Sequence, residues 1–476
     1  MAINDLIKAY SEYLDSLNIH VLRNVARRVG VYKPTDGKKE NLIDRTVSVL
    51  IGAVPPVPQS RRGAPLKDDS LDPKYMRRLA EIREEQELKN ADLSYQNVTG
   101  VQSGEADSEE GYDLPLRMGV LELQTGGSGV LRFDLCGKNA EKDAFVSAEN
   151  IRRFSLREGD YVVGTVSMRG ENMPVLEKVL SVNERTDYLT RGKFEEFPAS
   201  YPEEKIELSA GDARLSLRLA DLFCPIGKGQ RALIAAPSAA DASNFLREIA
   251  LSVRRQIDGG RNLRLLTLLT DATPEECAEY ESILCRIAVE SSAGFVCTTF
   301  DRSAREHLRA ARLLFARAAR LAETGEDVVV LVDSLTRLTY AANAALTASE
   351  EGRELSCGLN TAAFVLPKSL FSTARKLQDA GSVTVLAAVS VGRDDEAERA
   401  IECEFERFAN AHIVLDGGTP AQPIDLKKSG TLRAEKLLSA AEAACVRTIR
   451  EGGREEEAVK CMKDTVDNAA FVAAFR

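Results

Sequence analysis

The stretch from Pro237 to Ser243, PSAADAS, joins an apolar segment to an amphipathic one. This is the arrangement of a phosphate-binding loop, which needs a glycine-rich turn, a Lys for the terminal phosphates and a Ser or Thr hydroxyl for Mg²⁺. Only Ser243 supplies one of these groups, because Asp241 and Ala242 stand where glycine and lysine are wanted. The stretch therefore predicts either a nucleotide site with altered chemistry or the remnant of one.

Near-continuous apolar segments alternate with amphipathic ones from Arg191 onward. The apolar segments cover 232–237, 263–271, 294–301, 327–334, 382–391 and 412–416. This alternation predicts an α/β fold, in which a parallel sheet is covered by helices on both faces. The chemistry of such a sheet sits at the carboxyl ends of its strands, where the stretch above, Asp271 and Asp333 all fall. Ser243 and Asp333 are thus the candidate Mg²⁺ ligands, and each could instead be a helix-capping residue.

Length and composition limit the class of protein. With 476 residues, 44% of them hydrophobic, the chain is long enough for roughly two to four domains. Its formal charge of −10 restricts any nucleic-acid site to a local basic patch. Nine cysteines without CxxC pairs and three histidines predict neither a disulfide framework nor a zinc site. The absence of a long apolar run predicts no membrane span, so we expect a cytoplasmic protein.

Two N-terminal segments differ in character. Residues 1–52 have helical periodicity, and the connection GVYKPTDGKKENLID within them is typical of small helical nucleic-acid modules. A solvated basic loop explains this connection equally well. Residues 53–112 are rich in Pro and charge and are expected to form a linker.

Short segments of alternating hydrophobicity fill residues 113–186. They predict five strands and one helical turn, which together suggest a small β-barrel of the OB type. Such barrels bind single strands by stacking bases on aromatic side chains beside a basic groove. The candidate RNA-binding residues are Arg132, Phe133, Phe145, Arg152 and Arg153. Each of them could equally be an ordinary barrel or surface residue.

Several collinear stretches resemble the bacterial transcription termination factor Rho family. They include DAFVSAENIRRFSLREGDYVVGTV, LADLFCPIGKGQRALIAAP, DVVVLVDSLTRL and RELSCGLNTAAFVLPKSLFSTARK, within roughly residues 113–440. The resemblance implies a Rho-N/SAP-like helical module at 1–52, an OB-fold or cold-shock-like RNA-binding domain at 113–186, a RecA-like P-loop NTPase core at 187–450 and a helical tail at 451–476. It further implies a hexameric RNA-dependent ATPase and helicase that binds nascent RNA and releases RNA polymerase.

Matching the family's motifs residue by residue gives an uneven result. Asp333 matches the Walker B carboxylate, and the RNA-facing positions are matched by Arg353, Gly358, Lys368 and Arg375. Ala272 stands at the catalytic glutamate, and Leu432 stands at the arginine finger unless Arg433 serves after a shift of one residue. The matched phosphate-loop positions are Ser238, Ala239, Ala240, Asp241, Ala242 and Ser243, and Ala239 replaces a further lysine.

The energetic effect of these changes is large. A carboxylate such as Asp241 about 4 Å from a phosphate costs ~4 kcal/mol at an effective dielectric of 20, and the absent lysine removes an attraction of similar size. This corresponds to several decades of nucleotide affinity. We therefore expect a Rho-like RNA-binding ring protein with a weak or inactive ATPase site.

Two alternatives stay open. The first is an active RNA-dependent ATPase that uses Ser243, Asp333 and Lys228, and the second is a protein that keeps only the oligomer interface. ATP and Mg²⁺ are the cofactors if the site still binds them, and otherwise there is none. The expected partners are single-stranded RNA, RNA polymerase, and further copies in a homo-hexamer or an active Rho in a mixed ring. No membrane partner is expected.

Overall fold

The computed structural model describes residues 2–31, 38–50, 75, 78–79, 82, 115–136, 140–168, 173–210, 214–284, 294–347, 349–350, 352–392, 395–417 and 423–475. Contacts divide the chain into one unit that ends at Leu116 and a second that begins at Arg117. Each unit is described by itself. Among the described residues no helix is both long and apolar enough to cross a membrane.

Helices of the first unit lie at 2–50, where the helical periodicity predicts them. They are α1 (Ala2–Ser16), α2 (Ile19–Val29) and α3 (Lys39–Leu50). The Asn18 side chain caps α2 by accepting the N–H of His20 at 3.0 Å. Tyr10, Leu14 and Leu22 are buried in a common core. Residues 32–37 of the basic connection, and most of the predicted linker at 53–112, lie outside the described residues.

The second unit begins with a closed five-stranded barrel, as the alternating pattern predicts. Its strands follow the order β1-β2-β3-β5-β4. They are β1 (Leu116–Leu123), β2 (Gly129–Arg132), β3 (Ala144–Val146), β4 (Tyr161–Ser167) and β5 (Val175–Val182), with η1 (Ala140–Lys142) before β3 and α5 (Ala148–Arg153) before β4. The interior is apolar and includes Leu121, Leu131 and Val162.

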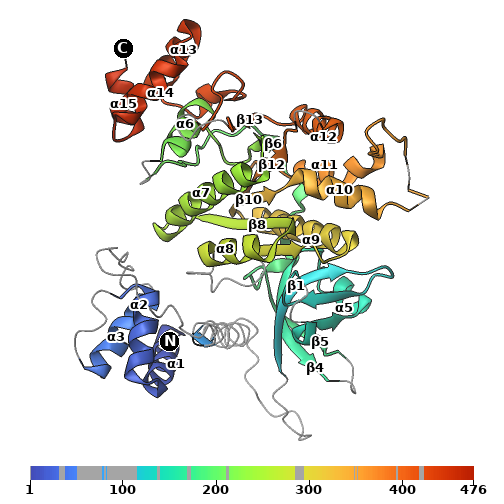
Figure 1. The fold of residues 1–476 in the computed structure, drawn as a ribbon. Coiled ribbons are helices and arrows are strands. Elements are labelled where there is room, and N and C mark those ends of the chain that lie inside the picture. Colours follow the sequence, from blue (N-terminus) through green and yellow to red (C-terminus); the bar gives the residue numbers. More distant parts are fainter. Residues whose placement is uncertain are drawn as a thin grey trace, which may run out of the picture. The chain divides into compact units, whose positions relative to one another are not determined.

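A large sheet follows the barrel in sequence, and its central strands are parallel (Figure 1). The strand order is β14-β13-β7-β12-β10-β8-β9. These strands are β7 (Arg231–Ala236), β8 (Leu263–Ala272), β9 (Phe295–Thr299), β10 (Asp327–Asp333), β12 (Ser382–Ser390), β13 (Ala411–Val414) and β14 (Gly430–Thr431), and the short β6 (Ala199–Ser200) and β11 (Arg375–Leu377) pair beside β12. The predicted parallel α/β sheet is therefore confirmed.

Helices cover both faces of this sheet, and two separate apolar clusters result. One face carries α6 (Leu215–Phe223), α7 (Ala239–Asp258) and α8 (Pro274–Leu284), and α13 (Ala440–Gly452), α14 (Glu455–Lys463) and α15 (Asn468–Ala474) extend the same cluster around α6 (Figure 1). The other carries α9 (Ala304–Glu323), α10 (Leu335–Ala345), α11 (Val365–Phe371) and α12 (Glu396–Glu406). Short 3₁₀ turns are η2 (Tyr188–Thr190), η3 (Phe194–Glu196), η4 (Thr361–Phe364) and η5 (Ala434–Lys436).

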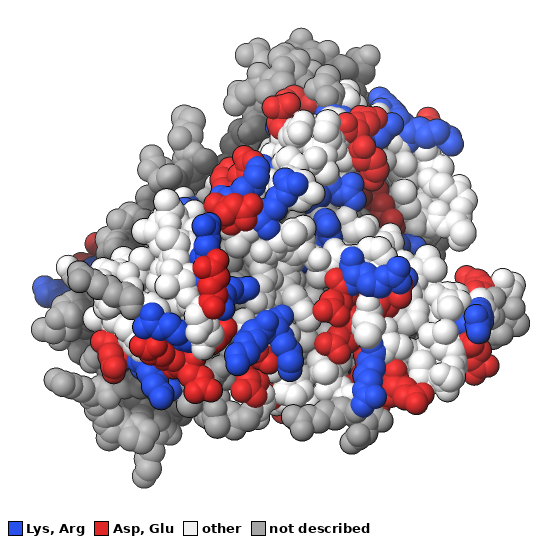
Figure 2. Space-filling view, turned by 90° about the horizontal axis from the view of Figure 1, so that it is seen from above, with Lys and Arg blue, Asp and Glu red and all other residues white. Residues whose placement is uncertain are grey.

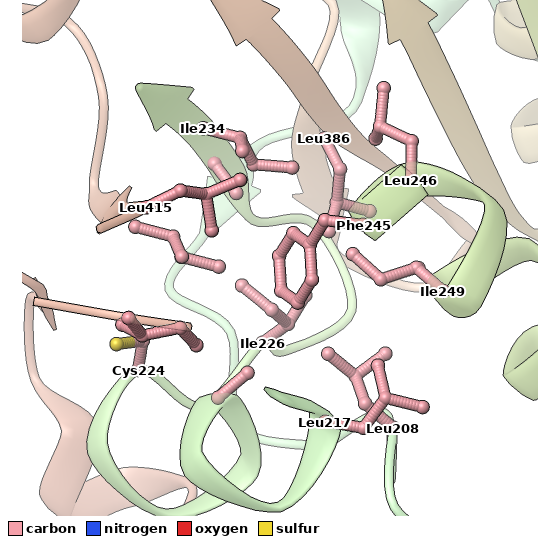
Figure 3. Packing of buried hydrophobic residues seen from close by; sticks show 14 of the residues in the cluster. Leu208, Leu217, Cys224, Ile226, Ile234, Phe245, Leu246, Ile249, Leu386 and Leu415 are labelled. Carbon is pink, nitrogen blue, oxygen red and sulfur yellow. The ribbon is translucent and has the colours of Figure 1, made fainter. Parts of the chain in front are cut away.

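The turn between β7 and α7 is held by the packing of Phe245. Its ring lies between Ile234 of β7, Leu386 of β12 and the helix α6 (Figure 3). Leu246 and Ile249 extend the same buried side of α7. Burying three such side chains stabilises this arrangement by roughly 1.5–3 kcal/mol each, so the first turn of α7 is fixed against the carboxyl end of β7.

The barrel is joined to α9 within the second unit. Gly159 has φ +85°, and a Cβ there would lie 2.3 Å from the backbone carbon of Ala316, so only glycine permits this approach. Arg157 forms a 3.1 Å ion pair with the fully buried Glu323. These contacts fix the barrel on the α/β core.

One covalent link departs from the sequence prediction. Cys277 of α8 and Cys297 of β9 form a disulfide with a Cα–Cα separation of 6.0 Å. Cysteine spacing alone indicated no disulfide, because this pair is created by the fold and has no CxxC signature.

Candidate nucleotide and RNA sites

The turn at the candidate phosphate loop is short. β7 ends at Ala236 and α7 begins at Ala239, so only Pro237 and Ser238 connect them. The Ser238 hydroxyl accepts the N–H of Asp241 at 3.2 Å and donates to the Asp241 carboxylate at 2.6 Å. This pair is a capping arrangement that closes the first turn of α7 on itself.

The residues present do not fit the phosphates of a nucleotide. A phosphate at a helix N-terminus binds free N–H groups and benefits from the helix dipole. Here Ser238 occupies the N–H of Asp241, and the Asp241 carboxylate supplies the negative charge that the dipole favours. A Cβ on Gly417 would lie 2.4 Å from Pro237 and 3.6 Å from an Asp241 oxygen, so a neighbouring segment also approaches this turn. Ala239, Ala240 and Ala242 contribute methyl groups only.

The candidate Mg²⁺ ligands do meet. Asp333, the last residue of β10, is buried, and the Ser243 side chain lies near enough to lower the pKa of its carboxyl group. Burial raises the pKa of Asp333, while Ser243 and Arg337 act in the opposite direction. The capping interpretations of both residues are wrong, because Ser334 caps α10 and Ser243 lies beyond the first turn of α7.

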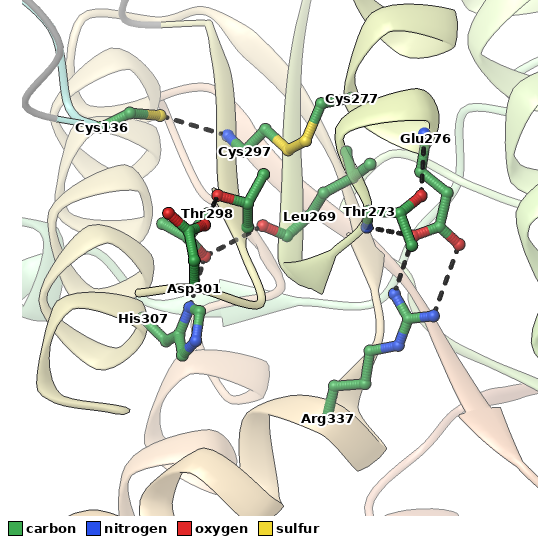
Figure 4. The surroundings of a disulfide bond; sticks show 11 residues. Cys136, Leu269, Thr273, Glu276, Cys277, Cys297, Thr298, Asp301, His307 and Arg337 are labelled. Atoms are coloured by element: carbon green, nitrogen blue, oxygen red, sulfur yellow. Dashed lines mark hydrogen bonds and ion pairs between the residues drawn. A yellow bond between two sulfur atoms is a disulfide. The ribbon is translucent and has the colours of Figure 1, made fainter. Parts of the chain in front are cut away.

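The position of the catalytic carboxylate is apolar. Ala272 ends β8 and is fully buried, so it cannot orient a water molecule. The nearby Glu276 accepts the Thr273 N–H at 2.8 Å and holds both terminal nitrogens of Arg337 at 3.3 and 3.4 Å (Figure 4). Burial raises the pKa of Glu276, but the Thr273 N–H and Arg337 outweigh it and lower the pKa overall. Sequence reasoning missed Glu276, although TPEE is a capping-box signature.

A catalytic role for Lys228 is excluded by its position. It forms ion pairs with Glu204 at 2.6 Å and Asp327 at 2.8 Å. Asp327 begins β10 and Asp333 ends it, which places Lys228 about 20 Å from the candidate site at 3.3 Å per residue. The expected role of Lys228 in an active ATPase fails because Lys228 precedes β7, whereas the chemistry would follow that strand.

The arginine-finger region is exposed. Leu432 is 61% exposed, and Arg433 adopts a left-handed conformation with φ +59°. The Arg433 guanidinium lies 3.7 Å from the centre of the Tyr201 ring. Arg433 is therefore held at the surface by a cation–π contact. Residues 418–422, which precede this region, lie outside the described residues.

Arg132 is held in ion pairs with two carboxylates of the barrel. Its Nε and Nη1 atoms pair with Glu122 at 2.6 Å and Asp143 at 2.8 Å. Glu122 also pairs with Arg309 of α9 at 3.2 Å. This network lies where the barrel meets the core, so Arg132 is not part of the candidate RNA surface.

The other barrel candidates are better placed. Phe133 is half-buried, and the Lys142 ammonium lies 4.3 Å from the centre of its ring. Phe145 is half-buried on β3, and Arg152 and Arg153 are exposed on α5. Lys142 was missed by sequence reasoning, and only its proximity to Phe133 identifies it. A ring beside a cation is the arrangement that single-strand binding uses.

The candidate RNA-binding residues of the α/β core differ in how free their side chains are to contact RNA. Arg353 is exposed on an ordered loop, in which its N–H donates to Thr361 at 3.0 Å and Gly358 has φ +78°. Lys368 is ion-paired with Glu404, and Arg375 lies 5.0 Å from the centre of the Phe194 ring. On the face drawn in Figure 2, basic side chains alternate with acidic ones rather than forming a continuous basic surface.

Two family models match this chain. Residues 117–187 match the Rho termination factor RNA-binding domain, which corresponds to the barrel. Residues 216–424 match the nucleotide-binding domain of the ATP synthase alpha/beta family. A solved ATPase from a type III secretion system is 20% identical, covers 65% of this chain and 92% of its own, and has a TM-score of 0.47. At that score the structural likeness adds nothing to the assignment.

Curated relatives share the same description, transcription termination factor Rho. The protein from Streptomyces coelicolor is 37% identical over 74% of this chain and 84% of its own. Those from Borreliella burgdorferi and Bacillus subtilis are 33% and 34% identical, over 77% and 76% of this chain and 72% and 85% of their own. The chain therefore belongs to the transcription termination factor Rho family.

Proposed function

We propose that this protein is a Rho-type factor that binds RNA and acts in transcription termination without an effective ATPase of its own. The observation that carries the proposal is the Ser238–Asp241 pair, which places the chain's own anion at the helix N-terminus. The loss of the catalytic carboxylate at Ala272 and of the finger at Leu432 supports it. With Ala242 in place of the lysine, these changes act together against nucleotide binding and hydrolysis.

The partners follow from the family. Single-stranded RNA would bind the barrel through Phe133, Phe145, Arg152 and Arg153, with Lys142 beside Phe133. Inside a ring, Arg353, Gly358, Lys368 and Arg375 would face the strand. The relatives' description as termination factors supports an action on RNA polymerase in the cytoplasm. The ring is either a homo-hexamer or a mixed assembly with an active Rho, and the exposed Arg433 would then face a neighbouring subunit.

A second function is favoured by one observation. The Ser243 side chain lies close enough to Asp333 to lower the pKa of its carboxyl group, so the two Mg²⁺-ligand positions are together, as an active RNA-dependent ATPase with an altered loop requires. In that case ATP and Mg²⁺ are cofactors, whereas the first proposal needs neither.

Titration calorimetry with ATP and Mg²⁺, with and without a cytidine-rich RNA, separates the two functions. We expect RNA to bind and ATP to give no heat up to millimolar concentration. ATP binding that Asp333→Ala abolishes, while Asp258→Ala at the far end of α7 leaves it unchanged, would establish the second function instead. Absence of RNA binding would leave a protein that keeps only an oligomer interface.

A further inference from the structure

Three cysteines from distant parts of the chain meet beside β9 (Figure 4). Cys277 and Cys297 form the disulfide, although 20 positions separate them. The Cys136 sulfur accepts the N–H of Cys297 at 3.2 Å across 161 positions of sequence. The fold thus brings a third sulfur to a disulfide that already joins two elements.

The edge of the sheet explains why Cys136 lies there. β9 ends the strand order, so within the described part of the chain no strand accepts the N–H groups on one side of its backbone. The Cys136 sulfur accepts the N–H of Cys297 at this edge and helps to cover it. Three covalent bonds separate the Cys297 nitrogen from its own sulfur, which places the two sulfurs within about 8 Å of each other. Contact between the two sulfurs requires the Cys297 side chain to rotate toward the edge of the sheet.

The three sulfurs differ in access to solvent. Cys277 and Cys297 are 7% and 3% exposed, whereas Cys136 is only half-buried. A small reagent therefore reaches Cys136 before the other two. Thiol–disulfide exchange requires that the reagent reach a thiolate. Cys136 is therefore the cysteine of the three at which exchange with a small reagent begins.

We propose that Cys136, Cys277 and Cys297 form a thiol–disulfide exchange site that takes a small-molecule disulfide of the glutathione class. The Cys136 thiolate attacks glutathione disulfide, whose S–S bond breaks as a mixed disulfide forms and one glutathione thiolate leaves. The Cys297 thiolate then attacks the Cys136 sulfur and releases the second glutathione thiolate. Attack of the Cys277 thiolate on Cys297 completes the Cys277–Cys297 bond and returns Cys136 as a thiolate.

Electrons and protons balance in this sequence. The two thiols of Cys277 and Cys297 lose two electrons, which reduce one glutathione disulfide to two glutathione thiols. The two thiol protons end on glutathione. Run backward, the same steps open the bond, so its state follows the ratio of glutathione to its disulfide.

The Cys277–Cys297 disulfide attaches the start of α8 to the sheet. Cys277 lies in the first turn of α8, next to Glu276, which holds Arg337 and the Thr273 N–H. The closed disulfide ties this turn to β9. Cys136 follows the barrel strand β2, and its neighbour Leu135 accepts a hydrogen bond from Arg309 of α9 at 3.3 Å. Exchange therefore takes place where barrel, sheet edge and α8 meet.

The test uses the full chain in glutathione buffers of fixed redox ratio. Differential alkylation and peptide mass spectrometry measure the fraction of Cys277–Cys297 bond against time. We expect a reversible, ratio-dependent fraction. In Cys136→Ser the bond should form and open about tenfold more slowly, while its equilibrium fraction stays the same.

Cys403→Ser is the matched control, because Cys403 is an exposed free cysteine on α12. Its exchange rate should equal that of the unmodified chain. A second variant, Cys136→Ala, separates loss of the thiol from any effect of the serine hydroxyl, and thermal unfolding verifies that both variants fold. An unchanged rate in both Cys136 variants, or no Cys277–Cys297 bond at any ratio, would overturn the proposal.

Discussion

The Ser238 hydroxyl donates to the Asp241 carboxylate at 2.6 Å and accepts the Asp241 N–H at 3.2 Å. This pair sits at the helix N-terminus where a nucleotide-binding protein of this fold would hold phosphate. A carboxylate in the first turn interacts favourably with the helix dipole. The negative charge that stabilises α7 is therefore part of the chain, and an added phosphate would be repelled by it.

Restoring the two expected residue types should restore nucleotide binding. In Asp241→Gly combined with Ala242→Lys, a repulsion of about 4 kcal/mol is removed and a cation is added. We expect ATP to bind at least about 100-fold more tightly, measured by titration calorimetry. Asp258→Gly at the other end of α7 is the control and should change nothing. If the double variant still gives no heat with ATP, the closed turn rather than the charge prevents binding.

RNA binding should depend on Phe133 but not on Arg132. Base stacking on an aromatic ring is worth about 1–3 kcal/mol, so Phe133→Ala should weaken binding of a cytidine-rich RNA by about 5- to 150-fold. Lys142→Ala should weaken it less and reduce its salt dependence. Fluorescence anisotropy at two salt concentrations measures both effects.

Arg132→Met tests the structural assignment. The substitution leaves the almost fully buried Asp143 without its 2.8 Å ion pair, which destabilises the barrel. We expect a lower midpoint of thermal unfolding and an RNA affinity within about twofold of the unmodified protein at a temperature where both are folded. A loss of affinity as large as that of Phe133→Ala would return Arg132 to the RNA surface.

The helices and strands could be predicted from the sequence because the hydrophobic pattern of each one depends on residues that are close together in the chain. The run from Val328 to Val332 is apolar without interruption, and it forms β10, an interior strand between two parallel neighbours. Alternation in 113–186 predicted the barrel for the same reason. Asp333 was found because a carboxylate at the end of such a strand falls at the edge where ligands bind.

Long-range pairing could not be predicted in this way. Arg132 lies directly opposite Val120 on β1, which brings it beside Glu122, and only the strand register reveals this. Lys228 is neutralised by Asp327, which lies far along the chain. The disulfide likewise depends on the packing of α8 against β9. Charge and reactivity at these positions are properties of the tertiary structure.

His307 should make stability depend on pH. It is 4% exposed, and its Nδ1 lies 2.7 Å from the Thr298 hydroxyl, which itself donates to the Leu269 carbonyl (Figure 4). Burial lowers the pKa of His307 below 6.5, while Asp271, Glu306 and Asp301 oppose the shift. The unfolded chain then binds a proton below pH 6.5 that the folded chain does not. The contribution of His307 to the free energy of unfolding is fully present above pH 6.5, and it falls as the pH drops toward the folded pKa.

His307→Gln removes this titration. The unmodified protein should lose up to about 1.4 kcal/mol per pH unit more than the variant below pH 6.5. Thermal unfolding between pH 5 and 8 measures the difference. His20→Gln, an exposed histidine of α2, serves as the control. Burial lowers the pKa of His412 as well, so a smaller slope of the same sign should persist. Parallel curves for the unmodified protein and His307→Gln would contradict the assignment.

Arg218 should hold the C-terminal helices in place. Its guanidinium is 3% exposed and donates to the carbonyls of Met462 at 2.7 Å, Thr465 at 2.6 Å and Asp467 at 2.8 Å. Burial lowers its pKa, and Asp467 opposes the shift. The Met462 carbonyl lies in the last turn of α14, where a cation also meets the negative end of the helix dipole, and the other two carbonyls follow the helix. The Arg218 guanidinium therefore connects α6 to the end of α14 and to the segment between α14 and α15.

Arg218→Lys keeps the charge but not the planar fork, so it cannot serve all of these acceptors. Each buried carbonyl left without a donor costs about 1–3 kcal/mol. We expect hydrogen exchange in residues 455–475 to become at least about 30-fold faster, which corresponds to 2 kcal/mol of lost local stability. Arg214→Lys, which keeps the surface ion pair with Glu248, is the control. Because exchange is read residue by residue, faster exchange confined to 455–475 identifies a local clamp. Faster exchange throughout the core would instead show that Arg218 stabilises the whole sheet.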